Sequence, residues 1–163
     1  MSAIEKTYFH SPLGDLEITG SHGVIFSVHF MEETVNAEKA APGLVDCVRQ
    51  LEEYFSGKRK QFELSLQPNG TTFQRHVWDE LLKISYGKTI SYLQLARKLG
   101  DEKSIRAAAS ANGKNPIAII IPCHRVVGSN NDLVGYAGGL WRKQWLLEFE
   151  SGQQTLPLGS TPV

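Results

Sequence analysis

The run from Ile119 to Val127 holds the residues of this chain best suited to covalent chemistry. Three isoleucines and Pro122 lead into Cys123, and His124 and Arg125 follow directly. A lone cysteine in an apolar run is usually an inert core residue, because desolvation raises the pKa of its thiol. The two neighbouring basic side chains indicate a second reading, since a positive charge favours the nucleophilic thiolate.

His124 also offers a base for the thiol proton. Adjacent side chains on an extended segment point in opposite directions, so we expect a relay through water rather than direct contact. This segment therefore fits either an inert thiol or an activated nucleophile, and by spacing alone a cysteine hydrolase remains possible. Arg125 also fits a structural role, in which it holds the segment through hydrogen bonds.

The first 70 residues have the pattern of strands followed by a helix. Alternating apolar residues predict strands at 16–19 and 24–30 and again at Phe62, Leu64 and Leu66. Helical spacing joins four apolar positions ahead of Gly57, namely Leu44, Val48, Leu51 and Phe55. Pro68-Asn69-Gly70 is a strong turn signal, and we place a domain boundary there.

Beyond this boundary the pattern becomes helical. Thr71–Gln74 and Ser91–Gln94 each have the sequence of a capping box, which starts a helix. The first helix has an apolar face that extends to Ile84, and the second ends at Gly100. After a turn at Asp101, a third helix is expected to run to about Asn112, with Gly113 placed to end it. Two short helices joined by a tight turn predict a helix-turn-helix, although an αα-hairpin without a DNA role fits equally well.

The third helix carries little side-chain bulk apart from Arg106, because alanine and serine fill residues 107–111. A helix that reads base edges in the major groove normally carries several Asn, Gln, Arg or Lys side chains. This helix is better suited to close contact with DNA that does not depend on the base sequence, for example in a minor groove. Arg106 would then be the one long cationic side chain available for insertion. A core helix that packs tightly is the alternative, and composition does not separate the two.

The composition is that of a globular chain with one or two domains: 163 residues, 41% hydrophobic and 21% charged. The longest apolar run, 117–122, is far shorter than a membrane span, and residues 1–10 have no signal-peptide core. Two distant cysteines in different surroundings indicate a reducing, cytoplasmic compartment rather than a disulfide framework.

The formal net charge of zero conceals an asymmetry. Residues 1–70 hold six basic against ten acidic side chains, whereas residues 71–163 hold eleven against seven. A basic second half can meet a polyanion while the acidic half faces away, which favours nucleic acid as a partner only weakly.

Taken together, these residues resemble the O6-alkylguanine-DNA alkyltransferases, also called methylated-DNA–protein-cysteine methyltransferases. The resemblance rests first on Pro122-Cys123-His124-Arg125 followed by Val126-Val127. Ordered matches at family spacing precede it: Phe73-Gln74, Val77-Trp78, Tyr86-Gly87, Ile90-Ser91-Tyr92, Leu95-Ala96, Arg106-Ala107, Asn112-Gly113 and Asn115-Pro116. Others follow it: Gly135 to Leu140, Lys143, Trp145-Leu146-Leu147 and Glu150. The N-terminal half resembles the family only in length and strand pattern.

This resemblance implies an α+β protein in two parts. Residues 1–68 are expected to form a small ribonuclease-H-like α/β domain. Residues 71–150 are expected to form a mostly helical, winged-helix-like domain with the helix-turn-helix and the site. Residues 151–163, rich in Gly, Pro, Ser and Thr, are predicted to be a flexible tail.

The resemblance also implies roles for the matched residues. Cys123 is expected to be the nucleophile and alkyl acceptor, with His124 as its base through a bound water and Glu150 orienting the imidazole. Asn115 is expected to brace the helix-turn-helix against the cysteine segment. Tyr92 is expected to crowd the 3′ phosphate and to protonate the leaving guanine.

Contacts with DNA and with the extruded base follow in the same way. Arg106 is expected to enter the base stack and fill the space of the flipped nucleotide. The other implied DNA contacts are Ala107, Ala108, Ser110, Asn112 and Ser129. The implied pocket residues are Tyr136, Ala137, Gly138, Lys143 and Val126. Ala137 stands where some relatives have serine, so one hydrogen bond to guanine O6 is lost or comes from a backbone N–H.

The implied activity is repair by direct reversal. The alkyl group of O6-alkylguanine, and in addition of O4-alkylthymine, would move to Cys123 once and irreversibly after the nucleotide leaves the stack. No cofactor is expected, and the partner is double-stranded DNA that contains the lesion, bound by a monomer with no membrane association. Some relatives bind zinc in the first half, but His10, His22, His29 and Cys47 lack paired ligand spacing, so no metal site is expected.

Two other classes of protein compete with this interpretation. A lesion-binding alkyltransferase-like protein without turnover resembles this chain but has another residue at the cysteine position, so Cys123 argues against it. A winged-helix regulator with an inert thiol would need several base-reading side chains on residues 101–112, where we find only Arg106.

Overall fold

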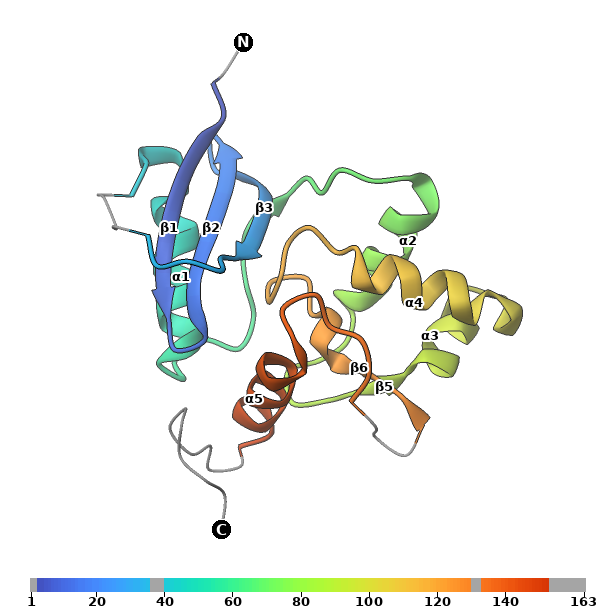
Figure 1. The fold of residues 1–163 in the computed structure, drawn as a ribbon. Coiled ribbons are helices and arrows are strands. Elements are labelled where there is room, and N and C mark those ends of the chain that lie inside the picture. The colour runs from blue at the N-terminus through green and yellow to red at the C-terminus, as the bar shows by residue number, and fades with distance from the viewer. Residues whose placement is uncertain (1–2, 36–39, 130–132, 153–163) are drawn as a thin grey trace. The chain divides into compact units, whose positions relative to one another are not determined.

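A computed structural model describes residues 3–35, 40–129 and 133–152, which form two compact units (Figure 1). The first unit comprises residues 1–70 together with 116–120, and the second comprises residues 71–115 and 121–163. No helix in the described ranges is long and apolar enough to cross a membrane. The last residues of the predicted tail, 153–163, lie outside the described ranges, while Ser151 ends a helix.

The first unit is built on a four-stranded sheet in the order β1-β2-β3-β4. The first three strands pair antiparallel, and they are β1 (Glu5–Ser11), β2 (Gly14–Ser21) and β3 (Val24–Phe30). The alternating residues predicted β2 and β3, whereas β1 was not predicted. The strand predicted around Phe62 is shorter than expected. Only β4 (Ser65–Leu66) pairs, in parallel with the start of β3.

Helix α1 (Val45–Phe55) packs against β1 and follows a short 3₁₀ turn, η1 (Pro42–Leu44). Its buried face includes Cys47, Leu51 and Tyr54, which agrees with the predicted helical spacing. Burial raises the pKa of the Cys47 thiol to about 12, so this cysteine is unreactive at neutral pH.

A late segment of the chain, residues 116–120, completes the first unit. The Val28 N–H donates to the Pro116 carbonyl at 2.9 Å, and the Ala118 N–H donates back to the Val28 carbonyl at 3.0 Å. Ile117 is thereby paired in parallel with Val28 and fully buried. Ile119 has a φ of +73°, a strained conformation for a β-branched residue.

The second unit is mostly helical, and the two predicted capping boxes start its first two helices. Thr71 and Gln74 cap α2 (Thr72–Leu81), and Ser91 and Gln94 cap α3 (Tyr92–Lys98). Helix α2 ends at Leu81, earlier than the apolar face predicts, and a turn carries Ile84 inward. Strand β5 (Ile90–Ser91) precedes α3 and pairs in parallel with β6 (Val126–Val127).

Helix α4 (Ile105–Gly113) follows α3 after Gly100 and a 3₁₀ turn, η2 (Glu102–Ser104), as the helix-turn-helix pattern predicts. Helix α4 packs against both α2 and α3. The Trp78 indole N–H of α2 donates to the Ala111 carbonyl at 2.9 Å, which fixes the end of α4. The last helix, α5 (Leu140–Ser151), contributes the buried residues Lys143, Leu146 and Glu150.

Candidate active site

The cysteine segment forms a 3₁₀ turn, η3 (Cys123–Arg125), rather than the extended strand that we expected. Pro122 precedes the turn, the Arg125 N–H donates to the Pro122 carbonyl at 3.0 Å, and β6 follows directly. Neighbouring side chains on such a turn diverge by roughly 120°, because it has about three residues per turn. All three residues of η3 are buried, with His124 fully so.

Glu150 of α5 binds both basic residues of this turn. One carboxylate oxygen lies 2.8 Å from His124 Nε2 and accepts from Arg125 Nη2 at 2.9 Å, and the other accepts from Arg125 Nε at 2.7 Å. Burial by itself raises the pKa of the Glu150 carboxyl, but His124 and Arg125 together hold it well below its usual range. The bidentate arginine pair fixes the carboxylate, which in turn orients the His124 ring.

Arg125 also ties the turn to the end of α2, since its Nη1 donates to the Ile84 carbonyl at 2.6 Å. Of the two roles left open for Arg125, these contacts favour the structural one, because the side chain is paired with Glu150 and is not among the groups that shift the pKa of Cys123. His124 keeps one ring nitrogen, Nδ1, buried and without a hydrogen-bond partner in the described ranges.

The Cys123 thiol is shielded from solvent, with 7% of the residue exposed. Burial raises its pKa, while a hydrogen bond from the Asn115 side chain and the charge of Lys143 act in the opposite direction. The resting thiol is therefore protonated, and the residues that favour its ionisation are Asn115 and Lys143. Asn115 also holds the turn, because its Nδ2 donates to the Ile121 carbonyl at 2.7 Å.

Lys143 is the fully buried cation of the site. Its Nζ donates to the Val134 carbonyl at 2.7 Å and lies 5.8 Å from the centre of the Tyr92 ring. Burial lowers the pKa of Lys143 to about 8, and the neighbouring Cys123 counteracts this shift. Lys143, which the sequence suggested only as support for the pocket, thus acts electrostatically on the Cys123 thiol.

A mostly apolar cavity of about 500 Å³ lies between α3, α4 and the loop before α5. It is lined by Tyr92, Ile105, Arg106, Ala109, Gly113, Val134, Gly135 and Tyr136. Cys123 is not part of this lining, but it acts electrostatically on two of the lining residues, Tyr92 and Tyr136. Burial raises the pKa of both the Tyr92 and the Tyr136 hydroxyl, and the charge of Cys123 raises each further. The cavity thus brings Tyr92, Arg106 and Tyr136 together.

The other residues that were predicted to contact DNA or the extruded base differ in how far they are buried. Arg106, Ala107 and Ser110 are exposed on α4, and Ser129 is exposed beyond β6. Ala108 and Asn112 are buried on the inner face of α4, so neither can contact DNA in this conformation. Val126 is fully buried in β6, and neither it nor Ala137 and Gly138 line the cavity.

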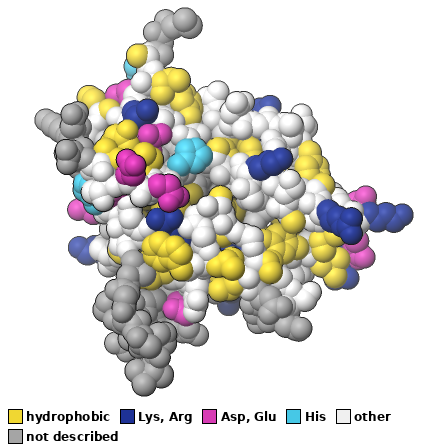
Figure 2. All heavy atoms as spheres, viewed as in Figure 1, with side chains coloured by type: hydrophobic (Ala, Val, Ile, Leu, Met, Phe, Trp, Pro, Cys, Tyr) yellow, Lys and Arg dark blue, Asp and Glu magenta, His cyan; other side chains and the backbone are white. Residues whose placement is uncertain are grey.

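Basic side chains gather at the α3–α4 end of the second unit (Figure 2). The exposed ones are Arg97, Lys98, Lys103 and Arg106, and Arg97 is paired with Glu102 at 2.7 Å. Arg106 of this group also lines the cavity. This arrangement suits a phosphate backbone.

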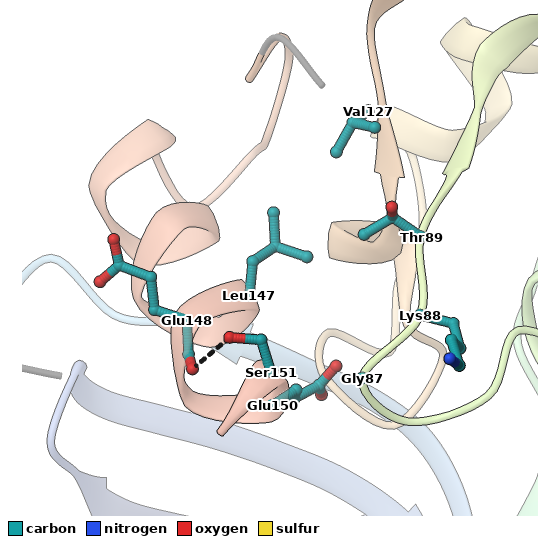
Figure 3. A pocket seen from close by; sticks show the side chains of 8 residues that line it. All are labelled: Gly87, Lys88, Thr89, Val127, Leu147, Glu148, Glu150 and Ser151. Carbon is teal, nitrogen blue, oxygen red and sulfur yellow. Dashed lines mark hydrogen bonds between the residues drawn. The ribbon is translucent and has the colours of Figure 1, made fainter. Parts of the chain in front are cut away.

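A second cavity, of about 320 Å³, was not predicted from the sequence (Figure 3). Its lining comes from the loop after Tyr86, from β6 and from the end of α5, namely Gly87, Lys88, Thr89, Val127, Leu147, Glu148, Glu150 and Ser151. Glu150 therefore forms part of its wall. No three His, Cys, Asp or Glu side chains lie together as a metal site in the part of the chain that the structure describes.

Comparison with known proteins identifies both halves of the chain. Residues 4–68 match the family model of the 6-O-methylguanine DNA methyltransferase ribonuclease-like domain, and residues 72–152 match that of its DNA-binding domain. A methylated-DNA–protein-cysteine methyltransferase of Methanosarcina acetivorans is 42% identical over 148 residues, which cover 87% of this chain and 95% of the relative.

Solved structures agree with these matches. The O6-methylguanine methyltransferase of Mycobacterium tuberculosis has a TM-score of 0.84 at 38% identity, covering 94% of this chain and 96% of that one. The M. tuberculosis OGT in complex with DNA has a TM-score of 0.80 at 42% identity, covering 88% and 92%. These findings confirm the resemblance and the predicted α+β architecture: the chain belongs to the methylated-DNA–protein-cysteine methyltransferases, with a ribonuclease-like domain followed by a DNA-binding domain.

Proposed function

We propose that this protein repairs O6-alkylguanine in double-stranded DNA by moving the alkyl group to Cys123 once and irreversibly. The nucleotide leaves the base stack, at a cost of a few kcal/mol, and enters the cavity lined by Tyr92 and Arg106. The observation that carries this proposal is the arrangement around that cavity: Tyr92, Arg106 and Tyr136 line it, and Cys123 acts electrostatically on both tyrosines.

The proposed transfer is a displacement at the alkyl carbon. His124 Nδ1 accepts the thiol proton, through a bound water, while Glu150 stabilises the resulting imidazolium. The sulfur forms a bond to the alkyl carbon, and the bond from that carbon to guanine O6 breaks. The electron pair goes to the guanine, which Tyr92 protonates. The product is a thioether, which no group of the chain can cleave.

Burial of Cys123 and the free Nδ1 of His124 support this sequence of events. A protonated resting thiol needs a base, and His124 is the histidine of η3 that Glu150 already orients. Lys143 and Asn115 are then the residues that lower the free energy of the thiolate. We propose the same chemistry for O4-alkylthymine, with a monomer as the active form.

Intact mass tests the proposal directly. Protein mixed with duplex DNA containing O6-methylguanine is expected to gain one methylene, and Cys123→Ser is expected to gain none. Cys47→Ser is the matched control and is expected to react like the wild type, because the Cys47 thiol has a pKa of about 12 and is buried in the other unit. Stable binding of lesion DNA without any mass gain would favour the alternative, a lesion-binding alkyltransferase-like protein.

Arg106→Ala tests the flipping step separately from the chemistry. The variant is expected to react about tenfold or more slowly with lesion duplex, because the extruded nucleotide loses the side chain that fills its place. Its rate with the free base O6-benzylguanine, which needs no extrusion, should stay close to that of the wild type.

Arg97→Ala provides the control for lost charge, since Arg97 is exposed on α3 and does not line the cavity. It should weaken binding modestly without changing the single-turnover rate at saturating duplex. Equal losses of rate on duplex and on free base in Arg106→Ala would contradict the assigned role.

A further inference from the structure

Asn112, near the end of α4, is buried behind the site and has no part in the steps proposed above. Only 2% of the residue is exposed. Its Nδ2 donates to the Cys123 carbonyl at 3.3 Å. Its side chain also forms a hydrogen bond with the Tyr92 hydroxyl, which in turn donates to the Val134 carbonyl at 3.2 Å. One side chain thereby links α4 to the thiol segment and to a hydroxyl that faces the cavity.

Packing does not explain a polar side chain at this position. The other buried residues of α4 are Ala108 and Ala111, so the inner face of this helix is otherwise apolar. Asn112 Oδ1 is buried with no hydrogen-bond partner in the described ranges. A buried acceptor left unpaired is unfavourable, whereas an apolar side chain of similar volume avoids that loss. The amide therefore combines one unpaired buried acceptor with the hydrogen bonds that its N–H groups donate to the Cys123 carbonyl and to the Tyr92 hydroxyl.

Hydrogen-bond directionality indicates what the amide does. The side-chain N–H groups of Asn112 can only donate. A bond donated to the Tyr92 oxygen occupies a lone pair of that oxygen and directs its O–H proton away from Asn112. In the free protein that proton points to the Val134 carbonyl. A guanine in the cavity would offer the hydroxyl another acceptor on the same side.

We propose that Asn112 is a positioning residue for alkyl transfer, which holds the Cys123 backbone and aims the Tyr92 hydroxyl into the cavity. This inference rests on the proposed function, because it assigns Tyr92 the task of protonating the leaving guanine. It replaces the contact with DNA that the resemblance suggested for Asn112. The residue acts through Cys123 and Tyr92 and does not touch the DNA.

Asn112→Leu tests this role, because leucine keeps the volume and removes the donors. At saturating O6-methylguanine duplex, the single-turnover rate is expected to fall about tenfold, the effect of losing a net hydrogen bond in the transition state. The dissociation constant for the duplex should change less than about twofold. The thermal midpoint should change only modestly, because the buried Cys123 carbonyl loses its donor while the unpaired Asn112 Oδ1 is also removed. Lys114→Met, exposed two residues further on, is the control and should keep the wild-type rate.

Two further readouts separate positioning from a structural role. In a Tyr92→Phe background, Asn112→Leu should cause only a small additional loss, because the effects of residues that act as a unit are not additive. The alkaline limb of the pH–rate profile should also move to higher pH. Burial raises the pKa of Tyr92 and the Asn112 hydrogen bond lowers it, so removing that bond leaves the hydroxyl protonated to a higher pH.

The possible failures are distinguishable. If the wild type transfers no methyl group, the proposed function itself fails. If the wild type transfers but Asn112→Leu matches its rate, the inference about Asn112 is wrong. It is equally wrong if the loss is fully additive with Tyr92→Phe, or if weaker DNA binding or a lower thermal midpoint accounts for all of it.

Discussion

Replacing Glu150 with glutamine is expected to lower the free energy of unfolding by about 3–5 kcal/mol, as when one partner of a buried ion pair is removed. The carboxylate pairs with Arg125 through two hydrogen bonds and with His124 through a third. Glutamine preserves the volume but leaves the Arg125 guanidinium buried without a counter-charge. Urea unfolding at neutral pH measures the loss.

Glu148→Gln is the matched control on the same helix. Its carboxylate accepts from Gln144 and is not part of the buried network, so the expected change is within about 0.5 kcal/mol. A loss in Glu150→Gln no larger than that of the control would mean that the buried ion pair is not important for stability.

The same carboxylate also determines how the free energy of unfolding changes at acidic pH. Its pKa is depressed in the folded protein, whereas in the unfolded chain it is near the ordinary value of 4.5. Stability from Glu150 is therefore complete well above that value and is lost as the pH falls below it, by up to about 1.4 kcal/mol per pH unit. Glu150→Gln should flatten this part of the curve of unfolding free energy against pH.

Lys143→Met is expected to slow methyl transfer about tenfold or more at neutral pH. An opposite charge within a few ångströms shifts a pKa by roughly one to three units, so losing Lys143 leaves less thiolate at Cys123. The variant also loses the hydrogen bond to the Val134 carbonyl. Single-turnover rates at saturating duplex measure the effect, with Lys88→Met, an exposed lysine on the second cavity, as the control.

The pH dependence identifies charge as the cause. Burial lowers the pKa of Lys143 to about 8, so the lysine is charged below that pH and largely neutral above it. The ratio of wild-type to Lys143→Met rates should therefore be largest below about pH 8 and should narrow as the pH rises. A ratio that stays constant across this range would indicate that Lys143 acts only by holding the loop.

Much of the fold could be predicted because its signals are local. Each capping box joins residues only three positions apart, so Thr71 and Ser91 mark the starts of α2 and α3 without reference to the rest of the chain. Alternation within β2 and β3 and the spacing of α1 are equally local. The motif around Cys123 identified the family for a different reason, since its residue types match at many ordered positions.

The features that the sequence did not predict depend on contacts between residues that lie far apart in the sequence. The sequence left open whether Arg125 favours the thiolate or holds the segment, because its partner Glu150 lies 25 residues further on. The inward face of α4 depends on where α2 and α3 pack, so Ala108 and Asn112 could not be assigned to the buried side from composition. The buried Lys143 ammonium likewise donates to the Val134 backbone carbonyl, and side-chain patterns in the sequence do not reveal a backbone acceptor.

Residues 116–120 belong to the first unit although they follow α4 in the sequence, so a cut after Gly70 does not separate the two units. A fragment that starts at Thr71 retains these residues but lacks β3, so Ile117 would lose the Val28 backbone against which it is buried. An apolar strand edge exposed in this way pairs readily with other copies of itself. By pairing with residues 116–120, the N-terminal half thus prevents this segment, which precedes Cys123, from pairing with other copies of the chain.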